Sequence, residues 1–299
     1  MLILLTNDDG IYAPGLAALE RQLHRLGEVC LVAPALEQSG VGHSITYLTP
    51  LIVKEVFRGR RRWGWAVEGS PADCVKIGTT ELCPKTPELV VSGINSGLNA
   101  GINVLYSGTV AAAIEGAFFG ITSVAVSLEY NEHAEFDRAA GLAVDVIGQI
   151  LRQKGPQPQL YNVNIPRAAL AGKPEVRVVP MDVARYDDQF QRRTDPWGRD
   201  YYWATGHPPA GLADRQTDLA ALAKGFVSIT PLDYDMTKRS VLAEMEPWEF
   251  CLDEPAAEGP LPTESAESAG REPVVKARPK RKQTEAKDHE TAPDPRAGA

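Results

Sequence analysis

Oxygen-bearing side chains stand directly after several short apolar runs of this 299-residue sequence. Asp8 and Asp9 follow the first run, Ser39 follows the second, and Asn95 follows a later one. Ligands bind beyond the carboxyl ends of parallel strands, so we expect these residues at one edge of a sheet. Adjacent carboxylates repel unless a cation neutralises them, and hard divalent cations prefer oxygen ligands. The pattern predicts a magnesium or manganese site; alternatively, the two acids only form a turn and cap the next helix.

A glycine-containing segment from Asn95 to Thr109 leads into an alanine-rich helical pattern. Backbone N–H groups and the positive end of the dipole at a helix N-terminus attract phosphate, and Ser107 and Thr109 add hydroxyl groups. Glycine also serves tight turns and close packing, so a structural role for Gly108 and its neighbours stays open. His43 lies on the loop after the second apolar run, where it could donate a proton, bind phosphate or serve the structure alone.

Strand and helix patterns alternate along most of the chain, and these elements must position the polar residues. Strands are predicted over residues 1–6, 28–34, 44–56, 63–68, 88–92, 123–128, 176–180 and 226–230, and helices over 14–26, from 70 onward, 109–119 and 136–153. Such alternation is typical of an α/β fold. We therefore expect a Rossmann-like, mostly parallel sheet with helices on both faces.

The span from Tyr186 to Thr205 carries several aromatic residues among many charges and shows no long helical pattern. We expect it to form a hairpin within a C-terminal, β-rich arm that covers about residues 185–252. Exposed aromatic residues at such a place usually mark a protein interface, so the arm is predicted to serve oligomerisation. A small satellite core within one subunit is the alternative.

The composition changes abruptly near Glu254. Residues 254–299 contain no aromatic residue and are rich in proline and charge, which predicts a disordered tail after a folded domain of residues 1–253. The basic run from Lys276 to Lys282 could contact nucleic acid or a partner, or remain solvated.

Charge and hydropathy exclude other classes of protein. A net charge of -8 argues against broad electrostatic capture of nucleic acid, so no stable nucleic-acid partner is expected. The most apolar stretch, Val110 to Leu128, is interrupted by glycine and polar residues, which predicts no membrane-spanning helix. The first apolar residues run into two acids without a basic leader, unlike a secretory signal, so a cytoplasmic location is expected.

Several segments resemble, in order and at plausible spacing, the motifs of the SurE family of survival-protein nucleotidases. They are Leu5 to Ile11, Ala33 to Thr46, Gly69 to Val75, Ser92 to Gly97, Tyr106 to Ala113, Asn162 to Pro166 and Thr217 to Leu232. The likeness runs from Met1 to about Leu252, and only the tail stands outside it.

The resemblance implies a metal-dependent phosphomonoesterase that hydrolyses nucleoside 5'- and 3'-monophosphates to nucleoside and phosphate, with short polyphosphate as a further substrate. It implies that Asp8, Asp9, Ser39 and Asn95 hold one Mg²⁺ or Mn²⁺ per subunit. It also implies a homodimer or homotetramer that assembles through C-terminal arms.

Catalytic roles are assigned to Asp8 and Asn95. In the expected mechanism Asp8 orients or deprotonates a metal-activated water that attacks phosphorus, and a phospho-aspartyl intermediate at Asp8 is the alternative. The expected phosphate and substrate contacts are Asn7, Gly40, His43, Ser96, Ser107, Gly108 and Thr109. Because a fold does not settle function, a non-catalytic nucleotide-binding regulator and a phosphosugar or glycosyl enzyme on a similar sheet remain alternatives.

Overall fold

The structure is a computed structural model that describes residues 1–184, 186–207 and 215–251. The chain divides into one unit from Met1 to Lys238 and a second that begins at Arg239 and contains the short helix α6 (Arg239–Met245). The predicted tail, residues 254–299, lies outside the described residues. The domain boundary at residue 253 therefore stays a prediction.

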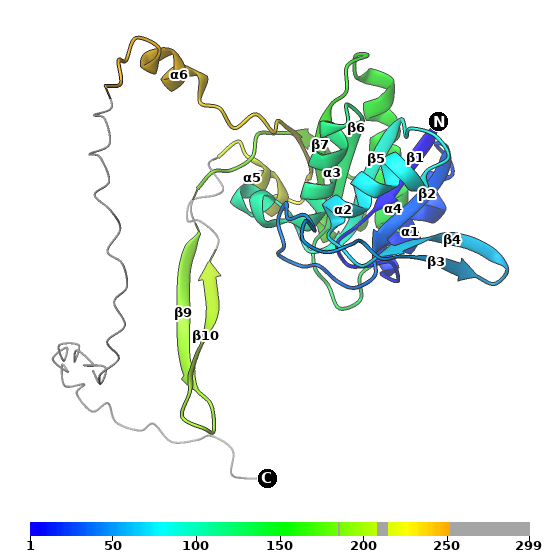
Figure 1. Ribbon diagram of the computed structural model, residues 1–299, viewed down its shortest axis with the longest axis horizontal. Helices are drawn as coiled ribbons and strands as arrows, with labels where there is room; N and C mark the ends of the chain where they lie inside the picture. Colours follow the sequence, from blue (N-terminus) through cyan, green and yellow to red (C-terminus); the bar gives the residue numbers. More distant parts are fainter. Residues whose placement is uncertain (185, 208–214, 252–299) are drawn as a thin grey trace, which may run out of the picture. The chain divides into compact units, whose positions relative to one another are not determined.

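A nine-stranded sheet forms the centre of the first unit (Figure 1). Its strands are β1 (Leu2–Thr6), β2 (Glu28–Pro34), β3 (Val53–Arg58), β4 (Arg61–Val67), β5 (Leu89–Ser96), β6 (Thr122–Leu128), β7 (Leu160–Ile165), β8 (Val176–Val178) and β11 (Val227–Leu232), in the order β3-β4-β2-β1-β5-β6-β7-β11-β8. The pairs from β4 to β7 are all parallel, whereas β3 runs antiparallel to β4 and β11 antiparallel to β7. This confirms the predicted mostly parallel sheet.

Helices pack on both faces of the sheet, as the alternating side-chain directions of a strand require. Ile3 and Leu5 of β1 belong to one core cluster, which includes residues of α1 (Pro14–Leu23) and α4 (Phe136–Gln153). Leu4, between them, belongs to a second cluster with α2 (Pro71–Ile77) and α3 (Gly108–Phe118). The remaining helical segments are η1 (Gly78–Leu82), η2 (Gly101–Tyr106), η3 (Arg167–Leu170) and α5 (Asp218–Ala223).

At Gly15, helix α1 approaches the backbone of β5 without an intervening side chain. A Cβ atom at Gly15 would lie 2.2 Å from the carbonyl oxygen of Ile94, so only glycine fits there. The helix N-cap is Ala13, which makes no side-chain capping bond. The alternative that Asp8 and Asp9 cap this helix is therefore wrong.

The predicted strand over residues 44–56 is largely wrong, because β3 begins only at Val53. The residues before it are tied to the start of α2 instead. The backbone N–H and the hydroxyl of Thr46 donate to the carboxylate of Asp73, and the hydroxyl of Ser70 donates to the carbonyl of Ser44. These bonds hold the segment as a loop against the helix, where it cannot also join the sheet ladder. Strand β5 was expected to end at residue 92 and instead reaches Ser96.

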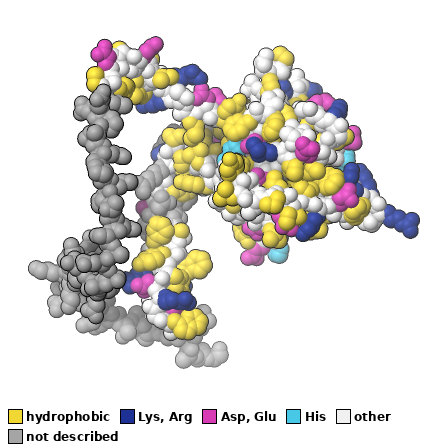
Figure 2. Space-filling view, viewed as in Figure 1, with side chains coloured by type: hydrophobic (Ala, Val, Ile, Leu, Met, Phe, Trp, Pro, Cys, Tyr) yellow, Lys and Arg dark blue, Asp and Glu magenta, His cyan; other side chains and the backbone are white. Residues whose placement is uncertain are grey.

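The predicted hairpin is present. Strands β9 (Asp187–Thr194) and β10 (Asp200–His207) pair antiparallel as a separate two-stranded sheet. Phe190, Trp197 and Trp203 are exposed on it, and Figure 2 shows hydrophobic side chains gathered along this hairpin. They belong to none of the core clusters found among the described residues, and the interface stays a prediction.

No helix within the described ranges combines the length and the apolar character needed to cross a bilayer.

Candidate functional site

The turn after β1 presents the acid pair. Asn7 is fully buried, and its amide Nδ2 donates to the carbonyl of Gly10 at 3.0 Å, which closes the turn. Asp8 is only 4% exposed, whereas Asp9 is half-buried. Asn7 therefore acts on the shape of the turn, and the two carboxylates project from it.

The N-terminus of α3 holds Asp8. The hydroxyl of Thr109 donates to Oδ1 of Asp8, while Ser107 caps the helix by accepting the N–H of Val110 at 3.1 Å. A Cβ atom at Gly108 would lie 2.9 Å from Cβ of Asp8, so the close approach requires glycine. The residues predicted to bind phosphate at this helix end thus also position the first acid.

The end of β5 reaches the second acid. The register with β6 shifts between Ser92 and Asn95, a local irregularity of the kind that re-aims side chains at the end of a strand. The backbone N–H of Ser96 donates to Oδ2 of Asp9 at 3.2 Å, and Nδ2 of Asn95 donates to the carbonyl of Gly97 at 2.7 Å. With its nitrogen committed, Asn95 has its amide oxygen available as a ligand.

The loop after β2 brings Ser39 to the same edge. The N–H of Gln38 donates to the carbonyl of Asp8 at 2.8 Å, and the hydroxyl of Ser39 donates to Oε1 of Glu37 at 2.6 Å. The loop is thereby attached to the turn that carries the acids.

His43, further along this loop, contacts α3. Its Nε2 lies 2.8 Å from Oε2 of Glu115, and its ring stacks on Phe118 with centroids 5.3 Å apart. The ammonium group of Lys76 donates to the other oxygen of this carboxylate, Oε1, at 3.2 Å. Burial raises the pKa of Glu115, but the hydrogen bonds from His43 and Lys76 outweigh it and hold that pKa below its ordinary value. These contacts anchor the loop and favour the structural alternative for His43, and its contact with phosphate stays a prediction.

An open cavity of about 480 Å³ joins these elements. The predicted site residues that line it are Asp8, Asp9, Ser39, Gly40, Asn95, Ser96 and Ser107. Four other predicted site residues do not line the cavity: Asn7, His43, Gly108 and Thr109. Each of them contacts or abuts a segment that does line it. The loops after β1, β2 and β5 thus meet at one edge.

Electrostatics in the cavity favour a bound cation. Burial, followed by the charge of Asp8, raises the pKa of Asp9 to about 6, and burial also raises the pKa of Asp8 despite the bonds from Thr109. Glu37 adds to the repulsion at both groups. A divalent cation would relieve this repulsion, so the donor set fits a hard metal ion.

The predicted donor set is not a cluster of carboxylates alone. Within the described part of the chain, no group of three or more His, Cys, Asp or Glu residues is arranged to hold a metal. Asp8 and Asp9 supply two carboxylates, and the other two donors are the Ser39 hydroxyl and the Asn95 amide. Such a mixed set leaves coordination positions for water and for a substrate oxygen.

Further lining residues were not predicted: Glu37, Leu98, Asn99, Asn103, Tyr106 and Tyr130. Glu37 and Tyr130 follow strands β2 and β6 by a few residues, so the strand-end rule could have found them. Asn99 had no such signal, because its place depends on contacts with distant strands.

A buried amide network fixes Asn99. Its carbonyl accepts from Nδ2 of Asn162 at 2.7 Å and Nδ2 of Asn164 at 3.0 Å, while its N–H donates to Oδ1 of Asn164 at 2.8 Å. Its own side chain donates to Ser127 at 2.9 Å. Strands β6 and β7 thereby hold a loop of the cavity in place.

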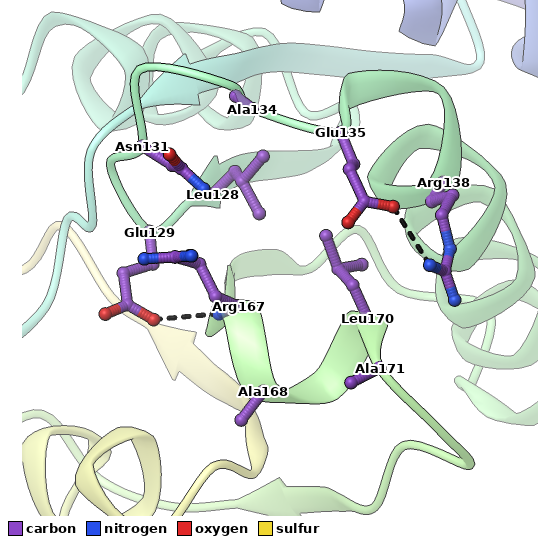
Figure 3. A pocket seen from close by; sticks show the side chains of 10 residues that line it. All are labelled: Leu128, Glu129, Asn131, Ala134, Glu135, Arg138, Arg167, Ala168, Leu170 and Ala171. Carbon is purple, nitrogen blue, oxygen red and sulfur yellow. Dashed lines mark hydrogen bonds and ion pairs between the residues drawn. The ribbon is translucent and has the colours of Figure 1, made fainter.

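A second cavity, of about 510 Å³, lies at the ends of β6 and β7 (Figure 3). Two contacts lie within its lining: Oε2 of Glu129 accepts the backbone N–H of Arg167 at 2.8 Å, and Nη1 of Arg138 donates to Oε2 of Glu135 at 2.9 Å. None of the predicted site residues lines it. The first cavity is therefore the candidate active site.

Comparisons with known proteins identify the family of the chain. The sequence profile of the family described as Survival protein SurE matches residues 3–188. The 5'-nucleotidase SurE of Rhodopirellula baltica is 59% identical over 249 residues, which are 83% of this chain and 98% of that protein. The 5'-nucleotidase SurE of Desulforudis audaxviator is 45% identical over 255 residues, which are 83% of this chain and 97% of that protein.

A solved structure is also similar. The crystal structure of the SurE protein from Aquifex aeolicus superposes with a TM-score of 0.72 at 37% identity, covering 82% of this chain and 98% of that one. The match of sequence profile, full-length relatives and fold leads to one assignment: this chain belongs to the SurE family.

Proposed function

We propose that this chain is a divalent-cation-dependent 5'-nucleotidase, a phosphomonoesterase that hydrolyses nucleoside 5'- and 3'-monophosphates to nucleoside and phosphate. Short polyphosphate is a further substrate in this proposal. The observation that carries it is the meeting of Asp8, Asp9, Ser39 and Asn95 in one open cavity, in a chain 59% identical to a protein named 5'-nucleotidase SurE.

Asp8, Asp9, Ser39 and Asn95 would hold one Mg²⁺ or Mn²⁺ per subunit. When bound, such an ion neutralises phosphate charge and lowers the pKa of a coordinated water. The chain's own contribution is the rigid placement of these ligands: Ser96 orients Asp9, and Thr109 orients Asp8. Such support from neighbouring residues typically changes metal affinity or activity about 10- to 100-fold.

Asp8 would orient the attacking water and accept its proton. The hydroxyl of Thr109 holds Oδ1 of Asp8, which fixes the orientation of this carboxylate in the cavity. The N–H groups at the start of α3, with Ser107, would bind the phosphate, since a helix N-terminus attracts anions. Phosphoryl transfer depends mainly on such positioning and charge stabilisation.

The active form would be a homodimer or homotetramer that assembles through the β9–β10 hairpin. The exposed aromatic side chains of this hairpin support the proposal, because contiguous aromatic surface of this kind is typical of interfaces. The cytoplasmic location expected from the sequence stays a prediction.

Phosphate release tests the function directly. Purified chain with 1 to 5 mM manganese or magnesium, an order-of-magnitude choice above typical metal affinities, should release phosphate from AMP and GMP. EDTA should abolish the release, and excess metal should restore it. A protein that binds AMP but releases no phosphate with either metal would instead be the nucleotide-binding regulator.

The nucleophile is tested by the stereochemical course at phosphorus, followed with a substrate whose phosphoryl group is made chiral by isotopic labelling. A single displacement by water inverts the configuration, whereas formation of a phospho-aspartyl intermediate and its hydrolysis by attack at phosphorus are two displacements and retain it. Retention, together with a trapped phosphoenzyme, would assign the nucleophile to Asp8.

A further inference from the structure

Two exposed tyrosines stand in the same cavity as the acid pair. Tyr106 is 62% exposed and Tyr130 is 66% exposed, and both line the cavity that contains Asp8 and Asp9. Aromatic side chains of this size are usually buried, because each can remove a large apolar area from water. Beside a polar site, such exposed rings would be covered by a ligand that has an apolar, planar part.

The backbone fixes both tyrosines close to the acids. Tyr106 ends η2, two residues before Gly108, the residue that abuts Cβ of Asp8. Its carbonyl accepts the N–H of Gly42 at 3.1 Å, which joins it to the loop that carries Ser39.

Tyr130 comes to the cavity from another element. It follows β6 by two residues, and the last residue of that strand, Leu128, is the register partner of Ser96, whose N–H binds Asp9. Neighbouring strands lie about 4.8 Å apart. The backbone of Tyr130 is therefore close to the acid pair through β5, whereas that of Tyr106 is close to it through the start of α3.

A smaller cavity of about 260 Å³ adjoins the acid cavity and shares Leu98 and Asn103 with it. Its lining is mostly apolar, and it also includes Glu129 and Tyr186; the apolar residues are Leu98, Ala100, Leu219, Leu222 and Ala223. A phosphate bound at the acids would thus have room for a bulky, uncharged substituent on this side.

We propose that Tyr106 and Tyr130 form the nucleobase subsite of this enzyme, a pair of aromatic faces on which the base of a nucleoside monophosphate stacks. The inference rests on the proposed nucleotidase function and deepens it. Stacking tolerates any base, because every base has a π-face, so the subsite selects for nucleotides over sugar phosphates without selecting among bases.

The experiment compares AMP with ribose 5-phosphate, which has the same phosphate and sugar but no base. Tyr106→Ala and Tyr130→Ala are each expected to lower kcat/KM for AMP about 5- to 100-fold, the range of base-stacking contributions measured by alanine substitution. The loss should appear mainly in KM, because stacking is made equally in the ground and transition states. kcat/KM for ribose 5-phosphate should change less than about two-fold.

Two control variants sharpen the comparison. Tyr106→Phe and Tyr130→Phe keep the aromatic face and should retain the wild-type preference for AMP. Tyr47→Ala removes a tyrosine that is 85% exposed and does not line the cavity. It should leave kcat/KM for both substrates unchanged.

The inference is overturned if, in both alanine variants, kcat/KM falls by the same factor for AMP and for ribose 5-phosphate, which would mean general damage to the site. It is equally overturned if neither variant changes the preference. Calorimetric binding of AMP and ribose 5-phosphate to the wild type and to the two alanine variants separates this inference from the nucleotidase proposal. Preferential AMP binding that depends on the tyrosines, without any phosphate release, would support the subsite while refuting the nucleotidase.

Discussion

At the scale of single residues, Asp9 is the group whose surroundings most resemble a metal ligand's. Burial and the neighbouring charge of Asp8 raise its pKa to about 6, and one N–H bond from Ser96 holds it. Asp9→Asn keeps the shape and the hydrogen bond while removing the charge. We expect phosphate release to fall at least about 100-fold, because loss of a ligand costs more than loss of a supporting contact.

The stability of the Asp9→Asn variant provides the control. In EDTA its melting temperature should equal or exceed that of the wild type, since the substitution removes a repulsive charge from the folded state. Circular dichroism should show an unchanged fold. A folded variant with wild-type activity would contradict the metal assignment.

A prediction about stability concerns Glu115, whose role is structural. Its folded pKa is held below the ordinary value of 4.5, so its bonds to His43 and Lys76 stabilise the protein above about pH 4.5, and this contribution is lost as pH falls through the folded pKa. Glu115→Gln should lower the free energy of unfolding by about 1 to 3 kcal/mol at pH 7 and by less at pH 3, because more of the carboxyl group is protonated there. Urea denaturation at the two pH values measures both.

A surface variant, Glu132→Gln, removes the same charge from an exposed position and should alter stability at neither pH. If Glu115→Gln were as stable as the wild type at pH 7, the contacts of His43 with this carboxylate would not be what anchors the loop.

At the scale of elements, the N-terminus of α3 positions the first acid through Thr109. Thr109→Val keeps the shape of the side chain but removes the hydroxyl that donates to Asp8. Activity should fall about 10- to 100-fold, as is usual when a group that orients a metal ligand is lost. Steady-state kinetics on AMP measures the change.

Thr109→Ser retains the hydroxyl and should recover most of the activity. Equal activity of the valine and wild-type proteins would show that the helix end does not orient Asp8.

Elements with strong periodicity were predictable from the sequence, and so was most of the acid site. Helix α4 and strands β1 and β2 were found close to their observed bounds because each has a clear apolar pattern. The site followed from the strand-end rule, which needs only the order of elements. The strand predicted over residues 44–52 is absent because hydrogen bonds from the backbone of this segment to side chains at the start of α2 outweigh its apolar composition.

Other features depend on long-range contacts that no local pattern records. Asn99 enters the cavity because Asn162 and Asn164, more than sixty positions later in the chain, bind its backbone. The structural role of His43 depends on Glu115, which lies in the middle of a distant helix. The sequence offered both residue types but not the pairings.

At the scale of the whole molecule, the β9–β10 hairpin is expected to set the number of subunits. Replacing Phe190 and Trp203 by serine removes two exposed aromatic side chains from it. We expect the molar mass in light scattering to fall from that of an oligomer to the 32.4 kDa of one chain, because aromatic anchors dominate interface energetics.

Tyr12→Ser, which alters an equally exposed aromatic outside the hairpin, should leave the molar mass unchanged. A wild-type protein that already scatters as a single chain would refute the role of the hairpin.

The direct contact of Gly15 with the carbonyl of Ile94 has a consequence for how a substrate is received. At Gly15 no side chain lies between the backbone of α1 and the carbonyl of Ile94 that could compress or repack. The loop that carries the acids and the strand end that carries Asn95 are consequently preorganised relative to each other. The substrate therefore binds to a preformed site, and little of its binding free energy is lost in ordering the protein.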